Sequence, residues 1–396
     1  MTEPTDPTDP TWQETYAARI MKSAVLPSRE LVRGEGCYVW DSHGVKYLDF
    51  LAGIAVNALG HAHPALVAAV SRQIATLAHV SNYFASPPQL ELAERLARLT
   101  GGDRVYFCNS GAEAIEAAIK LARRTGKPRI LALKDSFHGR TMGALSLTGK
   151  PLLREPFEPL LPNVEHIDTT IDALEKAMAP DVAALVVEPI KGEAGVVDLP
   201  EGYLAAAREL TSRHGALLIV DEIQTGAGRT GTWWAFQRAG IVPDAITMAK
   251  GIGGGVPIGA LVTFGAASDL LTSGQHGSTY GGNPLATAAS NAVLGEIERA
   301  GLVDNAEVRG GELRTAIAGL PLVAELRGRG LLIGVGLSRP VANAVVAKAL
   351  ELGLIINAPN DSSIRLAPPL IIGDPEVAEF IEKFTTALTQ TDEDQP

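Results

Sequence analysis

The chain has 396 residues, of which 46% are hydrophobic and 20% are charged, and its formal net charge is −11 at pH 7. This length predicts two or three domains, and the composition is typical of a soluble globular protein. The negative charge disfavours binding to nucleic acid or to anionic membranes. Two cysteines, Cys37 and Cys108, are too few for a disulfide framework and indicate a reducing, cytoplasmic location.

The two ends of the chain differ from the rest in composition. The first residues, MTEPTDPTDPT, carry neither the basic region nor the apolar stretch of a secretory signal, and no apolar run approaches the length of a membrane span. We expect residues 1–12, which are rich in Pro, Thr and Asp, to be disordered, and the acidic end TDEDQP (391–396) likewise.

Short apolar runs alternate with helical patterns through the middle of the chain. This rhythm predicts an α/β fold built from β-α-β units with a largely parallel sheet. From about residue 300 the alternation continues in what we expect to be a smaller, separate unit. The strand-like runs of the middle part are RVYFCNS (104–110), RILALKD (129–135), VAALVVEP (182–189), ALLIVDE (216–222) and DAITMAK (244–250).

Four polar residues close runs of this kind: Ser110, Glu188, Asp221 and Lys250. In open α/β sheets, ligands gather at the carboxyl ends of the strands. We therefore expect these four strand ends to converge on one site.

Lys250 lies in TMAKGIGGGVPIGA (247–260), directly before a run of glycines. A phosphate-binding P-loop needs its lysine after the glycines, and a dinucleotide fingerprint starting at Gly251 meets Val256 where its last glycine belongs. The stretch GALSLTGKP (143–151) is one residue out of P-loop register. Two interpretations of Lys250 remain: a structural lysine that extends to water, or an amine that does covalent chemistry.

Asp221 and the stretch after Ser110 could serve a cofactor or only the fold. The carboxylate of Asp221 follows an apolar strand and needs a cation or several hydrogen-bond donors. It could cap a helix N-terminus, pair with an arginine, or face the ring nitrogen of pyridoxal phosphate. Ser110 and Glu113 have the spacing of a capping box. Gly111 and Ala112 leave the same helix N-terminus bare, which suits a phosphate.

Three further residues could belong either to a site or to the fold. Phe137 could lie on the face of a cofactor ring or in the core. His61 and His63 have a loose metal-ligand spacing, but no third ligand cluster accompanies them, so we expect no metal.

Five motifs, in order along the chain, resemble the ornithine-type (class III) aminotransferases of fold type I. The resemblance implies a large cofactor-binding domain with a mainly parallel sheet (63–298), a smaller α/β C-terminal domain (299–396) and an N-terminal segment that packs with the small domain (13–62). The likeness extends from YLDFLAGIAVNALGHAHP (47–64) to IRLAPPL (364–370). The motifs are SGAEAIEAAIKLAR (110–123), FHGRT (137–141), VDEIQTGAGRTG (220–231), TMAKGIGGGVPIGA (247–260) and GSTYGGNP (277–284).

The resemblance implies pyridoxal 5'-phosphate as cofactor and a role for each matching residue. Lys250 would form the Schiff base and act as acid and base, Asp221 would pair with the pyridine nitrogen, and Gln224 would bind the ring hydroxyl. Phe137 would stack on the ring, and the start of the helix after Ser110 would bind the phosphate. The phosphate-binding residues would be Ser110, Gly111, Ala112 and, from a neighbouring subunit, Thr279, so the site would require a homodimer.

The resemblance also implies two carboxylate-binding arginines. Arg140 would bind the donor, N2-acetyl-L-ornithine, while Arg365 would bind the α-carboxylate of glutamate or 2-oxoglutarate; both could instead be surface ion pairs. Glu193 would pair with Arg365 and swing away when glutamate arrives, and Ser278 would contact substrate. Ile54 stands where ornithine aminotransferases carry a tyrosine, and an apolar residue there suits an acylated α-nitrogen.

The expected reaction therefore moves the δ-amino group of N2-acetyl-L-ornithine to 2-oxoglutarate, as in arginine biosynthesis. Alternative donors are free ornithine, 4-aminobutyrate, succinylornithine and N-succinyl-diaminopimelate. An aminomutase or decarboxylase on the same fold would not need 2-oxoglutarate. A non-catalytic binding protein is a third class, against which the intact Lys250, Asp221 and Arg365 count.

Overall fold

The structure is a computed structural model that describes residues 10–23 and 25–394. Residues 1–9, for which we expect disorder, lie outside the described residues. At the start of the described part, the side chain of Thr11 accepts a hydrogen bond that caps α1 (Trp12–Arg19). The chain is therefore helical from the last residue of the segment expected to be a disordered tail.

The acidic C-terminal end is helical, contrary to the expectation of disorder. The helix α14 (Asp374–Asp394) extends through it, and only residues 395–396 lie outside the description. Thr391 is buried, and Asp392 forms an ion pair with Arg339. The charge run is thus one solvated face of a packed helix, because its other face contacts the protein.

Seven strands form the large sheet: β4 (Arg104–Cys108), β5 (Arg129–Leu133), β6 (Val164–Ile167), β7 (Val182–Val187), β10 (Leu217–Asp221), β11 (Ala245–Met248) and β12 (Gly259–Thr263). Their order is β4-β12-β11-β10-β7-β5-β6, and only β12 runs antiparallel to its neighbours. Every residue of β7 and β11 is buried, as expected for strands covered on both faces.

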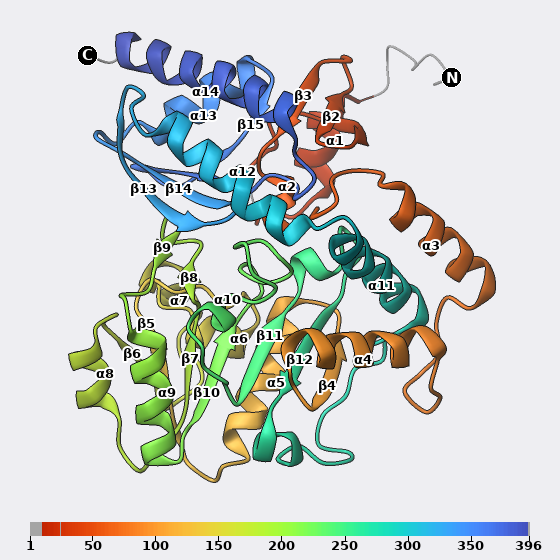
Figure 1. The fold of residues 1–396 in the computed structure, drawn as a ribbon, viewed down its shortest axis with the longest axis vertical. Helices are drawn as coiled ribbons and strands as arrows, with labels where there is room; N and C mark the ends of the chain where they lie inside the picture. Colours follow the sequence, from red (N-terminus) through yellow and green to blue (C-terminus); the bar gives the residue numbers. More distant parts are fainter. Residues whose placement is uncertain (1–9, 24, 395–396) are drawn as a thin grey trace.

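Helices cover both faces of this sheet. The helices between residues 64 and 299 are α3 (Pro64–Thr76), α4 (Pro87–Thr100), α5 (Gly111–Arg123), α6 (Met142–Leu147), α7 (Pro151–Arg154), α8 (Ile171–Ala177), α9 (Tyr203–His214), α10 (Ala235–Arg238) and α11 (Pro284–Arg299), with the 3₁₀ turns η1 (Glu155–Phe157), η2 (Lys250–Ile252) and η3 (Gly265–Asp269). In Figure 1, α4 and α9 lie in front of the strands and α5 lies behind them.

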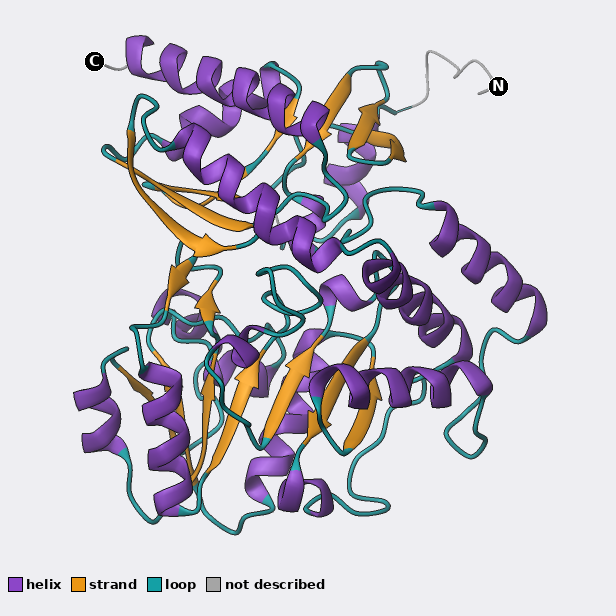
Figure 2. Ribbon diagram, in the orientation of Figure 1, coloured by secondary structure: helices purple, strands orange, loops and turns teal. Residues whose placement is uncertain are grey.

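A smaller antiparallel sheet follows: β13 (Val323–Arg329), β14 (Leu332–Leu337), β16 (Asn357–Asn360) and β17 (Ser363–Leu366). Its order is β13-β14-β17-β16. The helices α12 (Leu302–Ile317), α13 (Ala342–Glu351) and α14 belong to the same part of the chain. Figure 2 shows this unit above the large sheet, on the side toward which all its strands except β12 point.

The N-terminal strands complete a third sheet with a strand from the C-terminal part. These are β1 (Leu31–Glu35), β2 (Tyr38–Asp41), β3 (Lys46–Asp49) and β15 (Leu354–Ile355), in the order β1-β2-β3-β15. Leu48 of β3 pairs in parallel with Leu354 of β15. The N-terminal segment is therefore bonded to the C-terminal part, while the domain boundaries given above stay predictions.

A short hairpin lies between the large and small sheets (Figure 1). It consists of β8 (Ile190–Lys191) and β9 (Val197–Asp198), and its loop carries Glu193. Asp198 accepts hydrogen bonds from the backbone N–H of Gly328 at 2.8 Å and from Arg329 Nε at 3.1 Å. The loop is thereby tied to the small sheet.

One turn of the chain is left-handed. The element α2 (Ala52–Ala55) has positive φ at all four residues, namely 49° at Ala52, 65° at Gly53, 66° at Ile54 and 62° at Ala55. A left-handed conformation costs roughly 1–2 kcal/mol per non-glycine residue. The hydrogen bonds from the N–H groups of Leu51 and Ala52 to Asp49, at 3.0 and 2.8 Å, help to hold this strained turn in place.

Candidate active site

A cavity of about 290 Å³ opens at the carboxyl ends of the parallel strands. Three of the four strand-end residues, Glu188, Asp221 and Lys250, line it, and the fourth, Ser110, caps the helix whose first residues line it. The structure thus brings the four strand ends together. The complete lining is Gly111, Ala112, Phe137, His138, Gly139, Arg140, Glu188, Asp221, Ile223, Gln224 and Lys250.

Asp221 ends β10 and is buried. Its Oδ2 lies 2.7 Å from Nδ1 of His138, and its Oδ1 accepts hydrogen bonds from Thr247 Oγ1 and from the N–H of Ile223, both at 3.1 Å. Burial alone would lower the pKa of His138, but the hydrogen bond and the charge of Asp221 outweigh burial and raise it. The partner of the carboxylate is therefore a histidine, neither an arginine nor a helix N-terminus.

Lys250 begins η2 with a φ of 44°, in the left-handed region that residues other than glycine rarely adopt. Strain of this kind costs roughly 1–3 kcal/mol and is concentrated at functional sites. Burial, reinforced by the positive charge of Arg365, lowers the pKa of the Lys250 amine. The side chain lines the cavity, so this arrangement favours a nucleophilic amine over a lysine that extends to bulk water.

The N-terminus of α5 forms one wall of the cavity. Ser110 Oγ accepts a hydrogen bond from the N–H of Glu113 at 3.2 Å. The carboxylate of Glu113 binds the N–H of Asn109 at 2.8 Å instead of that of Ser110, so the capping box is displaced by one residue. A Cβ at Gly111 would lie 2.7 Å from Cδ1 of Ile223, so a larger residue there would have to displace that side chain. A helix N-terminus of this kind suits an anion such as phosphate.

Phe137 and Arg140 line the cavity from the loop after β5. The N–H of Phe137 donates to Glu188 Oε2 at 2.8 Å, which fixes this loop against the end of β7. The exposed Arg140 has its Cζ 5.6 Å from the centre of the Phe137 ring. Burial raises the pKa of Glu188 to about 7.

Arg365 lies behind the cavity on β17 and is 1% exposed. Arg365 forms an ion pair with Glu193. Its Nη1 also donates to Gln224 Oε1 at 3.4 Å, and its Nε donates to Asn357 Oδ1 at 3.1 Å. Burial would raise the pKa of Glu193, but Arg365, followed by Lys250, holds it below its usual value. Gln224 thus connects the cavity lining with the buried ion pair, and Arg365 is not a surface residue.

Ser278 and Thr279 lie apart from the cavity lining. Ser278 Oγ accepts hydrogen bonds from Asn109 Nδ2 and from the N–H of Gly281, both at 3.0 Å, and so packs beside the start of α5. Thr279 is exposed. A contact between Thr279 and a cofactor phosphate in another subunit therefore remains a prediction.

The two histidines with loose metal-ligand spacing have separate carboxylate partners. His61 Nε2 lies 2.9 Å from Asp49 Oδ2, and His63 Nε2 lies 3.9 Å from Glu296 Oε1. Within residues 10–23 and 25–394, no group of three or more His, Cys, Asp or Glu side chains could hold a metal ion. The same residues contain no helix long and apolar enough to cross a membrane.

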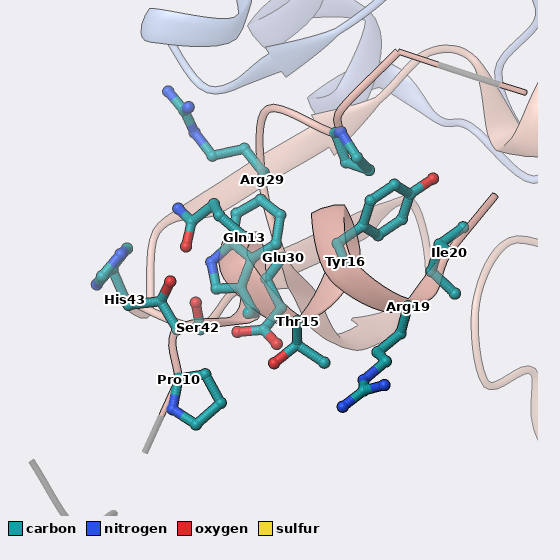
Figure 3. Close-up of a pocket in the computed structure, with 13 residues that line it drawn as sticks. Pro10, Gln13, Thr15, Tyr16, Arg19, Ile20, Arg29, Glu30, Ser42 and His43 are labelled. Carbon is teal, nitrogen blue, oxygen red and sulfur yellow. The ribbon is translucent and has the colours of Figure 1, made fainter. Parts of the chain in front are cut away.

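A larger cavity, of about 960 Å³, lies between α1 and the chain around Arg29 and His43 (Figure 3). Tyr16 and Arg19 line it from the helix. It contains none of the strand-end residues and no lysine. Size therefore does not identify the site, since the smaller cavity holds the reactive groups.

Comparison with known proteins agrees with this geometry. Residues 20–388 match the family described as Aminotransferase class-III. An acetylornithine aminotransferase from Streptomyces coelicolor is 51% identical over 385 residues, which is 96% of each protein. Another, from Mycobacterium tuberculosis, is 50% identical over 384 residues, again 96% of each. The chain belongs to the class III aminotransferases.

Solved structures share the architecture of this class III aminotransferase. An ornithine aminotransferase from Toxoplasma gondii has a TM-score of 0.92 and 34% identity, with 96% of this chain and 95% of that chain covered. An N-acetylornithine aminotransferase from Stenotrophomonas maltophilia has a TM-score of 0.84 and 36% identity, with coverage of 96% and 100%. The expected fold type I architecture is confirmed.

The site of this class III aminotransferase contains residues to which sequence analysis assigned no role. His138 stands inside the motif FHGRT and contacts Asp221, while Glu188 holds the loop of Phe137. The signal for Glu188 was its place at a strand end. His138 had no comparable signal, because its partner is far away in sequence.

Proposed function

We propose that this class III aminotransferase transfers the δ-amino group of N2-acetyl-L-ornithine to 2-oxoglutarate. The products are N-acetyl-L-glutamate 5-semialdehyde and L-glutamate, and the reaction belongs to arginine biosynthesis. Relatives that are about half identical over 96% of the chain carry the name acetylornithine aminotransferase. The structural observation that carries the proposal is the buried ion pair of Arg365 with Glu193 behind Lys250, because it suits a reaction in which only one of two substrates brings an α-carboxylate to that position.

The cavity fits pyridoxal 5'-phosphate. When bound, this cofactor supplies an aldehyde that accepts the amino group and a ring that withdraws electrons. The backbone N–H groups at Gly111 and Ala112, capped by Ser110, suit the phosphate. The remaining groups suit the ring: Asp221 for its nitrogen, Phe137 for its face, Gln224 for its hydroxyl and Lys250 for its aldehyde.

Lys250 has two tasks in the proposed reaction. Its lowered pKa favours the neutral amine that attaches the cofactor. In the proposed reaction the Lys250 amine also removes and returns a proton at the reacting carbon. Three hydrogen-bonding partners, His138, Ile223 and Thr247, fix the orientation of the Asp221 carboxylate in the cavity lining.

Two arginines divide the recognition of the substrates. Arg140, exposed at the cavity lining, binds the carboxylate of the acylated donor. Arg365 binds the α-carboxylate of glutamate or 2-oxoglutarate. While the acylated donor reacts, Glu193 neutralises Arg365, because a buried guanidinium without a partner is costly.

The proposed enzyme is a cytoplasmic homodimer. The two cysteines, Cys37 and Cys108, are buried free thiols, as suits a reducing compartment. Large apolar side chains next to Thr279 are open to solvent: Tyr83 is 91% exposed and Tyr280 63%. Contiguous exposed apolar patches mark interaction surfaces. A second subunit that covers them would bring Thr279 to its neighbour's cofactor phosphate.

A donor panel tests the proposed function. Purified protein supplied with pyridoxal phosphate is assayed with N2-acetyl-L-ornithine, ornithine, 4-aminobutyrate, succinylornithine and N-succinyl-diaminopimelate, each with and without 2-oxoglutarate. The acetylated donor should have the highest kcat/KM, and turnover should require 2-oxoglutarate. Lys250→Ala should show no turnover. Preference for another donor would overturn the substrate assignment, and turnover without 2-oxoglutarate would overturn the reaction type.

A further inference from the structure

Lys150 approaches the loop of Glu193 from the large domain. It lies in the stretch TGKP and precedes α7, and its Nζ donates a hydrogen bond to the backbone carbonyl of Glu193 at 2.5 Å. Within the described part of the chain, the Lys150 ammonium forms no ion pair with a carboxylate. A partly buried cation with free donors therefore lies beside a residue whose carboxylate has to change partner.

The main chain beneath Lys150 is held rigidly. A Cβ at Gly149 would lie 2.1 Å from the carbonyl oxygen of Leu133, so this position has to be glycine. The N–H of Gly149 donates to the carbonyl of Ser136 at 2.8 Å, and its own carbonyl accepts from the N–H of Asp135 at 3.2 Å. Lys150 therefore projects from backbone that is fixed against the end of β5.

The main chain of Glu193 is held on both sides as well. The N–H of Gly192 donates to Glu188 Oε1 at 3.4 Å, and the carbonyl of Ala194 accepts from Asn360 Nδ2 at 3.3 Å. The bond from Lys150 fixes the carbonyl between them. A change of partner by Glu193 would therefore need only a rotation of its side chain.

The Glu193 side chain is 28% exposed, so a displaced carboxylate keeps part of its hydration, and a nearby cation would stabilise it further. Besides Arg365, the cations that hold the pKa of Glu193 below its usual value are Lys250 and Lys150. Lys250 is occupied by the chemistry of the amino group. Lys150 already touches the main chain of Glu193, so its ammonium lies within the reach of that side chain.

We propose that Lys150 receives the carboxylate of Glu193 when the α-carboxylate of glutamate or 2-oxoglutarate occupies Arg365. Lys150 is then a positioning residue that stabilises the open state of the Glu193 gate and so selectively favours the glutamate half-reaction. The inference rests on the proposed function, and it adds the group that accepts Glu193 in its second position.

Single-turnover measurements of the two half-reactions test this inference. The variants are Lys150→Met, which removes the charge, and Lys150→Arg, which keeps it. Lys134→Met is the matched control, because Lys134 lies on the same edge of the sheet but is exposed and paired with Asp168 at 2.8 Å. Each holoenzyme is mixed with N2-acetyl-L-ornithine or with glutamate, and the cofactor spectrum is followed.

Lys150→Met should reduce kcat/KM for glutamate and 2-oxoglutarate by roughly tenfold, as expected for the loss of one short-range charge interaction, and leave the acetylornithine half-reaction within about twofold. Lys150→Arg should restore most of the glutamate half-reaction, and Lys134→Met should match the wild type. Equal slowing of both half-reactions, or no difference between the Met and Arg variants, would overturn the inference. Failure of the wild type to react with acetylornithine would instead overturn the proposed function.

Discussion

Glu193 and Arg365 form an ion pair in which the cation is 1% exposed. Removing one partner of a buried pair costs roughly 3–5 kcal/mol, because the other charge is left uncompensated. Glutamate avoids this cost, since its own carboxylate replaces Glu193. The two residues should therefore affect the two half-reactions in opposite ways.

Glu193→Ala should accelerate the glutamate half-reaction relative to the acetylornithine half-reaction and shift specificity toward α-amino donors. The free guanidinium of Arg365 would then accept any α-carboxylate. Stopped-flow measurement of each half-reaction decides the point. Arg365→Ala is the counterpart: it should lose glutamate and 2-oxoglutarate while largely sparing acetylornithine, which relies on Arg140. If Glu193→Ala changes both halves by the same factor, Glu193 is not a gate.

Glu188 should make the stability of the protein depend on pH. Burial raises the pKa of this carboxyl from the usual 4.5 to about 7. Between these values the folded protein binds more protons than the unfolded chain, so the free energy of unfolding should fall as pH rises, by up to ~1.4 kcal/mol per pH unit. Glu222, whose pKa burial also raises to about 7, contributes with the same sign.

Glu188→Gln should remove roughly half of this pH dependence in chemical denaturation, because the Glu222 contribution remains. Glu188→Gln combined with Glu222→Gln should remove the contributions of both carboxyls, while His138, whose pKa is raised, and His166, whose pKa burial lowers to about 4, still contribute to the profile. A single variant that retained the full wild-type slope would show that Glu188 is not one of the titrating groups.

At the scale of residues, sequence analysis located the groups that belong to local patterns. Lys250 and Asp221 follow strands and Ser110 starts a helix, so their place at one edge of the sheet was predictable. The contacts of His138 and Lys150 were not, because each depends on how loops distant in sequence pack together.

At the scale of elements, the left-handed turn α2 should make glycine more stabilising than alanine at position 54. Ile54 has a φ of 66° and is 39% exposed. Replacing it with glycine removes strain of roughly 1–2 kcal/mol, whereas replacing it with alanine removes the same side chain but keeps the strain. Ile54→Gly should therefore be about 1 kcal/mol more stable than Ile54→Ala, the reverse of the usual order in a helix.

Urea denaturation of the two variants gives this difference directly. Gly53→Ala is the complementary control: Gly53 has a φ of 65°, so a Cβ there should lower stability. Both Ile54 variants should also lose discrimination between acetylornithine and ornithine if the side chain contacts the acyl group. A less stable Ile54→Gly would show that the strain of the turn is relieved elsewhere.

The regular elements were predictable to different degrees. Buried apolar runs such as β7 and the glycine-bounded helix α5 follow local rules of burial and capping. The reversed direction of β12 and the left-handed α2 depend on tertiary contacts. The prediction that the acidic end of α14 is disordered was wrong. Its charged side chains form only one face of the helix, and the opposite face, which includes Thr391, is buried.

At the scale of the whole molecule, the exposed apolar groups near Thr279 predict a shared active site. Asn82 Nδ2 donates to the carbonyl of Ser278 at 2.8 Å and so joins the loop of Tyr83 to the loop of Thr279. Burial of this surface in a dimer would place Thr279 and Lys250 of different subunits in one site. Such a site can be completed by subunits that are inactive on their own.

Subunit exchange tests this arrangement. Lys250→Ala mixed with an inactive Thr279→Ala variant should recover activity, because one of the two sites in each hybrid is intact. Lys250→Ala mixed with Asp221→Ala should recover none, since both residues belong to the same chain's cavity. Absence of rescue in the first mixture, with subunit exchange demonstrated by labelled chains, would indicate a site built from one chain.

The pairing of Leu48 with Leu354 has a consequence for biosynthesis. A ribosome releases the chain from its N-terminal end, so β3 emerges long before β15, its only parallel partner in the sheet β1-β2-β3-β15. Until then one edge of β3 is open to pairing with other nascent chains, which is a route to aggregation. Premature termination anywhere before residue 354 would leave that edge permanently open, and a circular permutant that begins near β13 would close it early.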